Sequence, residues 1–136
     1  MTHKTVLLVE DELFVAIDIQ MTLEDDGWDV VGPFASNREA LSYLMNHKPA
    51  CAILDVRLID GDVFPVADKL HEAGIPFIFH SGHADPEELR RRYPGSSFYG
   101  KPCLPETLSR EADRLIEGRS RGMSEHTMRR VATVEH

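Results

Sequence analysis

The sequence has few of the features that identify secreted or membrane proteins. Its 136 residues include two cysteines, Cys51 and Cys103, which lie far apart and form neither a CxxC pair nor a metal-ligand spacing. We therefore expect two reduced thiols, as in cytoplasmic proteins. No apolar stretch reaches the roughly 18 residues of a membrane-spanning helix, and no apolar signal region follows Met1. These absences predict a soluble, cytoplasmic protein.

Basic residues are also scarce, with 15 Lys and Arg against 23 Asp and Glu and a net charge of -8. Because residues 119–136 carry four arginines and two glutamates, the first 118 residues hold a net charge near -10. Such a surface repels phosphate backbones, which argues against nucleic-acid binding. The length suits one compact domain, which we predict over residues 1–118, followed by a flexible tail over 119–136 that is too short for an output domain.

What the sequence does contain is a regular alternation of short apolar runs and helix-period segments. This pattern predicts an α/β fold, a doubly wound five-stranded parallel sheet with helices on both faces. The expected strands are residues 5–9, 30–31, 51–54, 75–79 and 97–99. The expected helices end near Gly27, His47, Gly74, Arg92 and Gly118. Ser36 and Glu39 form a capping box for the second helix, and the fourth, confined between prolines, is expected to be short or irregular.

Polar side chains follow four of these strands. An acidic run at residues 10–12 follows the first strand, Asp55 the third, Ser81 the fourth and Lys101 the fifth. Ligands of open parallel sheets bind beyond these carboxyl ends. Three clustered carboxylates repel one another unless a cation neutralises them, and hard oxygen ligands favour Mg²⁺. Each residue alone is explained as a helix cap or a turn, but their joint placement favours a functional site.

The chemistry of this residue set is that of phosphoryl transfer. With the metal and Lys101 withdrawing negative charge, Asp55 is able to attack a phosphoryl group. The oxygens of the product would then be held by the metal, the ammonium and the Ser81 hydroxyl.

Four motifs resemble the response regulator receiver domains, the CheY-like family, over about residues 5–118. They are Val6-Leu-Leu-Val-Glu-Asp-Glu12, Ile53-Leu-Asp-Val-Arg57, Phe79-His-Ser-Gly82 and Tyr99-Gly-Lys-Pro102. The resemblance implies a flavodoxin-like fold, with Asp55 as phosphoacceptor. It implies a Mg²⁺ ion bound by Glu10, Asp11, Asp55 and the backbone carbonyl of Arg57. It also implies Ser81 and Lys101 as phosphate ligands, Phe98 as the switch aromatic with Tyr99 as its neighbour, and a cis Lys101-Pro102 bond.

Three further segments are similar to single-domain alphaproteobacterial receivers that work with HWE-type histidine kinases. They are Val31-Gly-Pro33, Phe64-Pro-Val-Ala-Asp68 and Ile75-Pro-Phe-Ile-Phe79. The chain departs from these receivers at His80, Ser81, His83 and Cys103. The implied function is a stand-alone response regulator, a monomer or weak dimer, phosphorylated by a sensor histidine kinase or a histidine phosphotransfer protein. It would not be an enzyme beyond accepting and slowly losing its own phosphoryl group.

Two other functions remain open at this point. A pseudo-receiver would keep the fold as a binding module without the chemistry, and the complete residue set argues against it. A phosphatase of the haloacid dehalogenase type needs a second acid two residues after its nucleophile. Arg57 occupies that position and cannot act as a general acid.

The first helix carries two apolar stripes, of which only one can face the sheet. One comprises Ala16, Ile19 and Leu23, and the other comprises Phe14, Ile17 and Met21. The hypothesis is that the second stripe docks a partner helix carrying the phosphodonor histidine. The alternative is that the tail or a neighbouring loop covers it.

Overall fold

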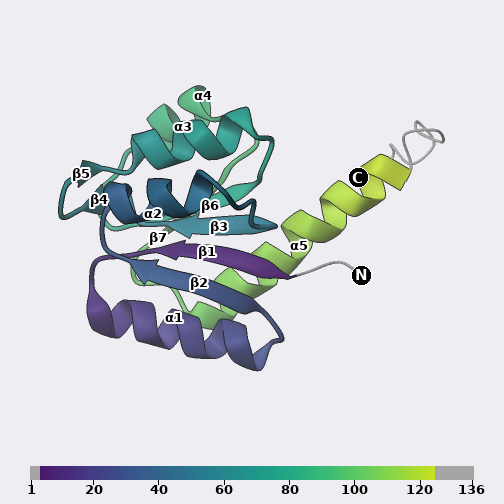
Figure 1. Ribbon diagram of the computed structural model, residues 1–136, viewed down its shortest axis with the longest axis horizontal. Coiled ribbons are helices and arrows are strands. Elements are labelled where there is room, and N and C mark those ends of the chain that lie inside the picture. Colours follow the sequence, from purple (N-terminus) through teal and green to yellow (C-terminus); the bar gives the residue numbers. More distant parts are fainter. Residues whose placement is uncertain (1–3, 125–136) are drawn as a thin grey trace.

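The computed structural model of the protein describes residues 4–124 and contains the predicted five-stranded parallel sheet (Figure 1). The strands lie in the order β2-β1-β3-β6-β7. Their bounds are β1 Thr5–Val9, β2 Asp29–Phe34, β3 Cys51–Leu54, β6 Phe77–Ser81 and β7 Ser97–Gly100. The order reverses direction at β1, so the helices cover both faces and the fold class predicted from the sequence is confirmed.

Two helical layers enclose the sheet (Figure 1). On one face lie α1 (Leu13–Asp25) and α5 (Pro105–Ser124), and on the other lie α2 (Asn37–Leu44), α3 (Phe64–Glu72) and α4 (Pro86–Arg92). The seven residues of α4 confirm the expectation of a short fourth helix. None of the helices within residues 4–124 has the length and apolar character to cross a membrane.

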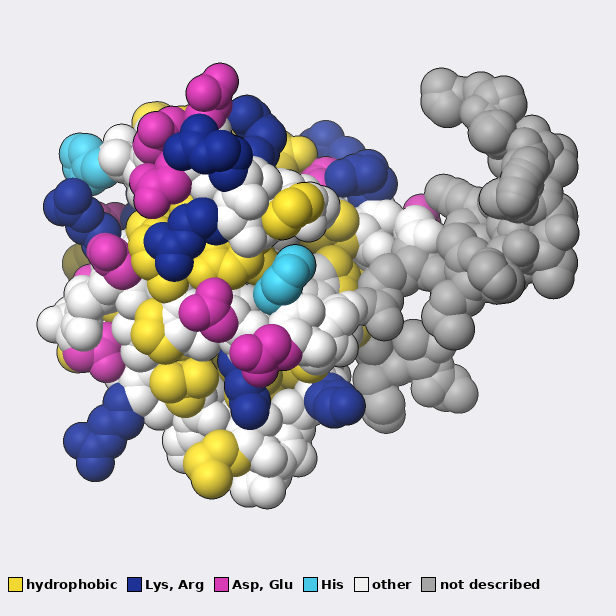
Figure 2. All heavy atoms as spheres, turned by 90° about the horizontal axis from the view of Figure 1, so that it is seen from above, with side chains coloured by type: hydrophobic (Ala, Val, Ile, Leu, Met, Phe, Trp, Pro, Cys, Tyr) yellow, Lys and Arg dark blue, Asp and Glu magenta, His cyan; other side chains and the backbone are white. Residues whose placement is uncertain are grey.

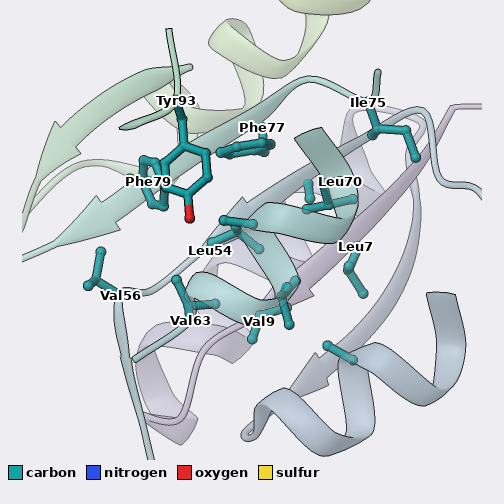
Figure 3. Packing of buried hydrophobic residues seen from close by; sticks show 14 of the residues in the cluster. Leu7, Val9, Leu54, Val56, Val63, Leu70, Ile75, Phe77, Phe79 and Tyr93 are labelled. Carbon is teal, nitrogen blue, oxygen red and sulfur yellow. The ribbon is translucent and has the colours of Figure 1, made fainter. Parts of the chain in front are cut away.

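The strands are continuously apolar because each strand buries side chains on both faces of the sheet. Leu7, Leu54 and Phe79 pack toward α2, α3 and α4. Leu8 and Ile78 pack on the opposite face, toward α1 and α5. Figure 3 shows the first of these layers, in which the ring of Tyr93 lies against Phe77 and Phe79. Over α3 and α4, Figure 2 shows acidic, basic and apolar side chains interspersed.

A small antiparallel ribbon after Asp55 was not predicted. It consists of β4 (Arg57–Leu58) and β5 (Gly61–Asp62), two residues each. In its turn, the Asp60 carboxylate accepts the backbone N–H groups of Asn37 at 2.9 Å and Arg38 at 3.2 Å. Asp60 thereby satisfies free donors at the start of α2 and fixes the segment that follows the phosphoacceptor candidate.

Several expected boundaries were wrong. The second helix ends at Leu44 rather than near His47, and the second strand spans residues 29–34 rather than 30–31. The fourth parallel strand begins at Phe77 rather than at residue 75 and includes Ser81, so the serine ends a strand instead of starting a loop. The last helix does not end at Gly118 but continues to Ser124. Gly118 does not adopt the left-handed conformation that Gly74 adopts after α3 (φ 72°), and a glycine inside a helix costs only about 1 kcal/mol relative to alanine. Residues 119–124 of the expected flexible tail are therefore helical, and residues 125–136 lie outside the described part.

Candidate functional site

The sheet brings the predicted strand-end residues together at one edge. Asp11, Asp55, Ser81 and Lys101 line a single cleft of about 690 Å³. Glu10 is 4% exposed and lies 3.2 Å from the Lys101 ammonium, so it belongs to the same site. The ribbon of β4 and β5 lies at the end of the sheet where the chain passes from β1 into α1 (Figure 1). Residues separated by up to 91 positions thus form one site.

Three carboxylates crowd together in this cleft. One oxygen each of Glu10, Asp11 and Asp55 lies within 4.8 Å of the others. Burial, followed by the charge of Asp55, raises the pKa of Glu10 to about 7 and also raises the pKa of Asp11. Such crowding penalises the ionised forms, and a divalent cation relieves that penalty. An all-oxygen donor set of this kind fits Mg²⁺.

The Lys101 ammonium bridges two of the three acids. Its Nζ donates to Asp55 Oδ2 at 3.1 Å and to Glu10 Oε2 at 3.2 Å, with Glu12 Oε1 at 3.5 Å. Burial lowers the pKa of Lys101, but the charges of Glu10 and Asp55 outweigh it, and the net pKa is raised. The ammonium therefore stays charged beside the candidate phosphoacceptor. The peptide bond between Lys101 and Pro102 is cis, as the family resemblance implies.

The Ser81 hydroxyl is buried at the cleft, where its Oγ accepts the backbone N–H of His83 at 3.3 Å. The backbone carbonyl of Ser81 accepts the N–H of Lys101 at 3.0 Å, which holds the ends of β6 and β7 together. Asp55 is tied to β1 in the same way, through its N–H to Val9 O at 2.8 Å. Arg57 lines the cleft, and the role of its backbone carbonyl as a metal ligand stays a prediction.

Phe98 and Tyr99, which are adjacent in sequence, face opposite sides of the sheet. Phe98 packs against the layer that contains Phe79, and the Tyr99 hydroxyl donates to Glu111 Oε1 of α5 at 3.1 Å. Glu111 also accepts hydrogen bonds from Ser97 and Arg114, which lower its pKa. The two aromatic side chains therefore belong to different layers, and the switch role of Phe98 stays a prediction.

Sequence reasoning missed the placement of His80, although this histidine had been noted as a departure from the family pattern. His80 is 2% exposed and its Nδ1 lies 4.0 Å from Glu10 Oε1. Burial, followed by the charge of Lys101, lowers the pKa of His80 to about 4, so the imidazole is neutral. A signal for this placement was present in the sequence. Successive side chains of a strand point to opposite faces of the sheet, so His80 lies on the face opposite Ser81, toward α1 and α5.

The structure confirms that one apolar stripe of α1 faces the sheet. Ala16, Ile19 and Leu23 are buried. On the other side of the helix, Phe14 is 82% exposed, Met21 58% and Ile17 36%. No contact within the described residues buries this second stripe, so no neighbouring loop in this part of the chain covers it.

Comparison with known proteins agrees with the geometry. The family model described as response regulator receiver domain matches residues 6–109. "Response regulator Rre1" of Synechocystis is 31% identical over 118 residues, which cover 82% of this chain and 51% of that protein. "Phyllosphere-induced regulator PhyR" of Methylorubrum extorquens is 27% identical, covering 76% of this chain and 40% of that protein. The chain therefore spans about half or less of these relatives.

Solved structures show the same fold. A response regulator receiver protein from Sinorhizobium medicae superposes with a TM-score of 0.78 at 27% identity, covering 86% of this chain and 97% of that one. Together, the doubly wound sheet and the acidic cleft at its carboxyl edge define a receiver-type α/β domain. The chain belongs to the response regulator receiver domain family of two-component signalling.

Proposed function

We propose that this protein is a response regulator that accepts a phosphoryl group on Asp55 and signals through contacts with other proteins. The donor would be the phosphohistidine of a sensor kinase or a histidine phosphotransfer protein. Glu10, Asp11, Asp55 and the Arg57 carbonyl would hold Mg²⁺. The observation that carries the proposal is the 3.1 Å contact of the Lys101 ammonium with the Asp55 carboxylate, in a cleft with two further acids.

In the proposed reaction, an Asp55 oxygen attacks the phosphorus, and an O–P bond forms as the P–N bond of phosphohistidine breaks. The electron pair of the P–N bond returns to the imidazole. A bound Mg²⁺ would supply neutralisation of the charge on the carboxylates and on the transferred group. Lys101 and the Ser81 hydroxyl would each donate a hydrogen bond to a phosphoryl oxygen.

The same contacts suggest how phosphorylation would be signalled. Ser81 Oγ accepts the His83 N–H in the free protein, so a turn of the hydroxyl toward the phosphate would weaken that bond. The loop before α4 would then shift relative to Phe98, which packs in the α3 and α4 layer. The face around β7 would report the phosphorylated state.

For the second apolar stripe of α1, we propose docking of a helix from the phosphodonor domain. The stripe of Phe14, Ile17 and Met21 is exposed, as is the neighbouring Leu13, and it begins directly after the acidic run at residues 10–12. A helix laid along the stripe would carry its histidine to the mouth of the cleft. Exposed apolar patches of this kind typically mark protein contacts.

Intact-mass measurement after incubation with acetyl phosphate and Mg²⁺ tests the chemistry. We expect one added phosphate on the wild-type protein and none on Asp55→Asn. Continuous release of phosphate from added phosphomonoesters would instead identify a phosphatase. Neither modification nor turnover would identify a pseudo-receiver that acts as a binding module.

Docking is tested with Phe14→Ser combined with Met21→Ser. We expect slower phosphoryl transfer from the kinase, while phosphorylation by acetyl phosphate stays unchanged because the cleft is intact. Met45→Ser is the matched control, since Met45 is 75% exposed on the other helical layer, at the end of α2. Equal loss with both donors, or an equal effect of the control, would refute docking through α1.

The partner is proposed more narrowly as a kinase of the HWE type. We also propose that the protein acts in the cytoplasm, as a monomer or weak dimer. The resemblance of residues 31–33, 64–68 and 75–79 to the alphaproteobacterial receivers supports this choice. A transfer assay with purified HWE-type kinases and kinases of other classes would test it. Faster labelling by a kinase of another class would contradict it.

A further inference from the structure

His80 is a buried polar residue on the face of the sheet that packs against α1 and α5. The apolar side chains of this layer include Leu8, Ile53 and Ile78. The imidazole is 2% exposed, and neither of its ring nitrogens has a hydrogen-bond partner among the described residues. Burying a polar group without a partner costs about 1–3 kcal/mol. Because the imidazole also lines the cleft, we expect its hydrogen-bond partner among the polar groups of the cleft.

The nearest candidate partner is the Glu10 carboxylate. Glu10 Oε2 accepts the Lys101 ammonium at 3.2 Å and the Glu12 N–H at 3.1 Å. Glu10 Oε1 faces His80 Nδ1 at 4.0 Å. One oxygen is therefore held by Lys101 and Glu12, and the other is directed toward His80.

We propose that His80 is a positioning residue for the magnesium site, in which its Nδ1–H hydrogen-bonds Glu10 Oε1 when Mg²⁺ binds. The inference rests on the proposed function, because it requires the Mg²⁺ ion of the phosphorylation site. Closing 4.0 Å to a hydrogen-bond length of about 2.9 Å needs a shift of about 1 Å, which side-chain rotation supplies. Hydrogen bonds to metal-binding carboxylates fix their orientation and contribute to metal affinity.

Burial favours the neutral imidazole that this role requires. Lys101 faces His80 and disfavours the imidazolium, while Asp55 and Glu12 act in the opposite direction and are outweighed by burial. A neutral imidazole carries one N–H, so it serves as donor to Glu10 without adding a positive charge that would repel the cation.

The test compares two replacements of similar size. His80→Leu removes the donor and keeps an apolar filling, and His80→Gln keeps an N–H donor. Affinity is measured by electron paramagnetic resonance of free Mn²⁺ during titration, with Mg²⁺ as competitor. We expect His80→Leu to weaken Mg²⁺ binding about tenfold and His80→Gln to recover most of the loss. His83→Leu, which alters an exposed histidine lining the same cleft, should bind as the wild type does.

A double-mutant cycle separates positioning from packing. In a Glu10→Gln background, His80→Leu should cause little further loss of affinity, because the proposed partner carboxylate is already absent. An equal tenfold loss in that background would overturn the inference. So would unchanged Mg²⁺ binding by His80→Leu in an otherwise wild-type protein.

Two controls keep these outcomes interpretable. A wild-type protein that binds no divalent cation would overturn the proposed function and the inference with it, whereas normal wild-type binding with an unaffected His80→Leu overturns the inference alone. Thermal unfolding without metal reports whether each variant is folded. If leucine overpacks the site, His80→Val provides the same comparison with a smaller side chain.

Discussion

The Nζ atom of Lys101 lies 3.1 Å from Oδ2 of Asp55, although 46 residues separate the two in sequence. The same ammonium contacts Glu10, so one cation partly neutralises two buried acids at the position where a phosphoryl group would arrive. Addition of that group would convert a charge-paired carboxylate into an acyl phosphate. Lys101 would then be free to pair with the phosphate. Phosphorylation would thereby change the contacts of Lys101 at the ends of β1, β3 and β7.

Replacing Lys101 with alanine should strengthen Mg²⁺ binding to the unphosphorylated protein by about threefold to tenfold. The reason is that Lys101 competes with the metal for the carboxylates of Glu10 and Asp55. The same replacement should slow phosphorylation by acetyl phosphate, because a donor to the phosphoryl oxygens is lost. Isothermal titration calorimetry and intact-mass time courses measure the two effects, and weaker Mg²⁺ binding would contradict the competition.

The stability of the metal-free protein should include a contribution from Glu10 that falls as pH rises. The ordinary pKa of this carboxyl is 4.5, and burial with the nearby Asp55 raises it to about 7 in the folded protein. The folded state therefore binds the proton more tightly, and the contribution is complete below about pH 4.5 and lost as pH rises through about 7. Urea unfolding at pH 5 and pH 7.5 measures this loss.

Glu10→Gln is the control for the pH effect, because glutamine does not titrate. The variant should lose less stability than the wild-type protein between the two pH values. Saturating Mg²⁺ should also reduce the wild-type loss, since the cation stabilises the ionised carboxylate. An identical pH dependence in both proteins would show that Glu10 does not titrate in this range.

Ser81→Ala should slow phosphorylation of Asp55 by about a hundredfold, the usual effect of removing one donor to a developing oxyanion. Mg²⁺ affinity should change little, because Ser81 is not among the clustered carboxylates. Ser81→Thr retains the hydroxyl and should restore most of the rate. A fast Ser81→Ala variant in rapid-mixing mass measurements would exclude this hydroxyl as a phosphate partner.

Tyr93→Phe should reduce the free energy of unfolding by about 1 kcal/mol. The Tyr93 hydroxyl donates to Asp68 Oδ1 at 2.6 Å and joins the end of α4 to α3, and a single hydrogen bond contributes about this much. Urea denaturation measures the change. Tyr43→Phe is the control, because the Tyr43 ring stacks on His47 at the surface of α2 and should tolerate loss of its hydroxyl. Equal losses in both variants would refute a specific role for the Asp68 contact.

Much of the site was predictable because its residues occupy equivalent places along the chain. Asp11, Asp55 and Lys101 each directly follow a strand or lie one residue beyond, and the carboxyl ends of parallel strands meet at one edge. The buried stripe of α1 and the Ser36 cap of α2 were predictable for a related reason. Helical periodicity and capping depend on residues three or four positions apart.

The features that were missed depend on contacts between distant segments. The approach of His80 to Glu10 requires the register of two strands that β3 separates in the sheet. The cap that Asp60 forms on α2 joins residues 23 positions apart. Local sequence patterns carry no information on such distances, and Gly118 shows that local signals also mislead when a helix continues through them.

The sequence by itself determined the order of strands and helices and the chemical groups at each strand end, because these follow from periodicity and residue type. The tertiary structure decided how those groups face one another. It gave Lys101 two carboxylate partners and buried His80 beside Glu10. Such pairings arise from strand register and from packing between layers, which exist only once the whole chain has folded.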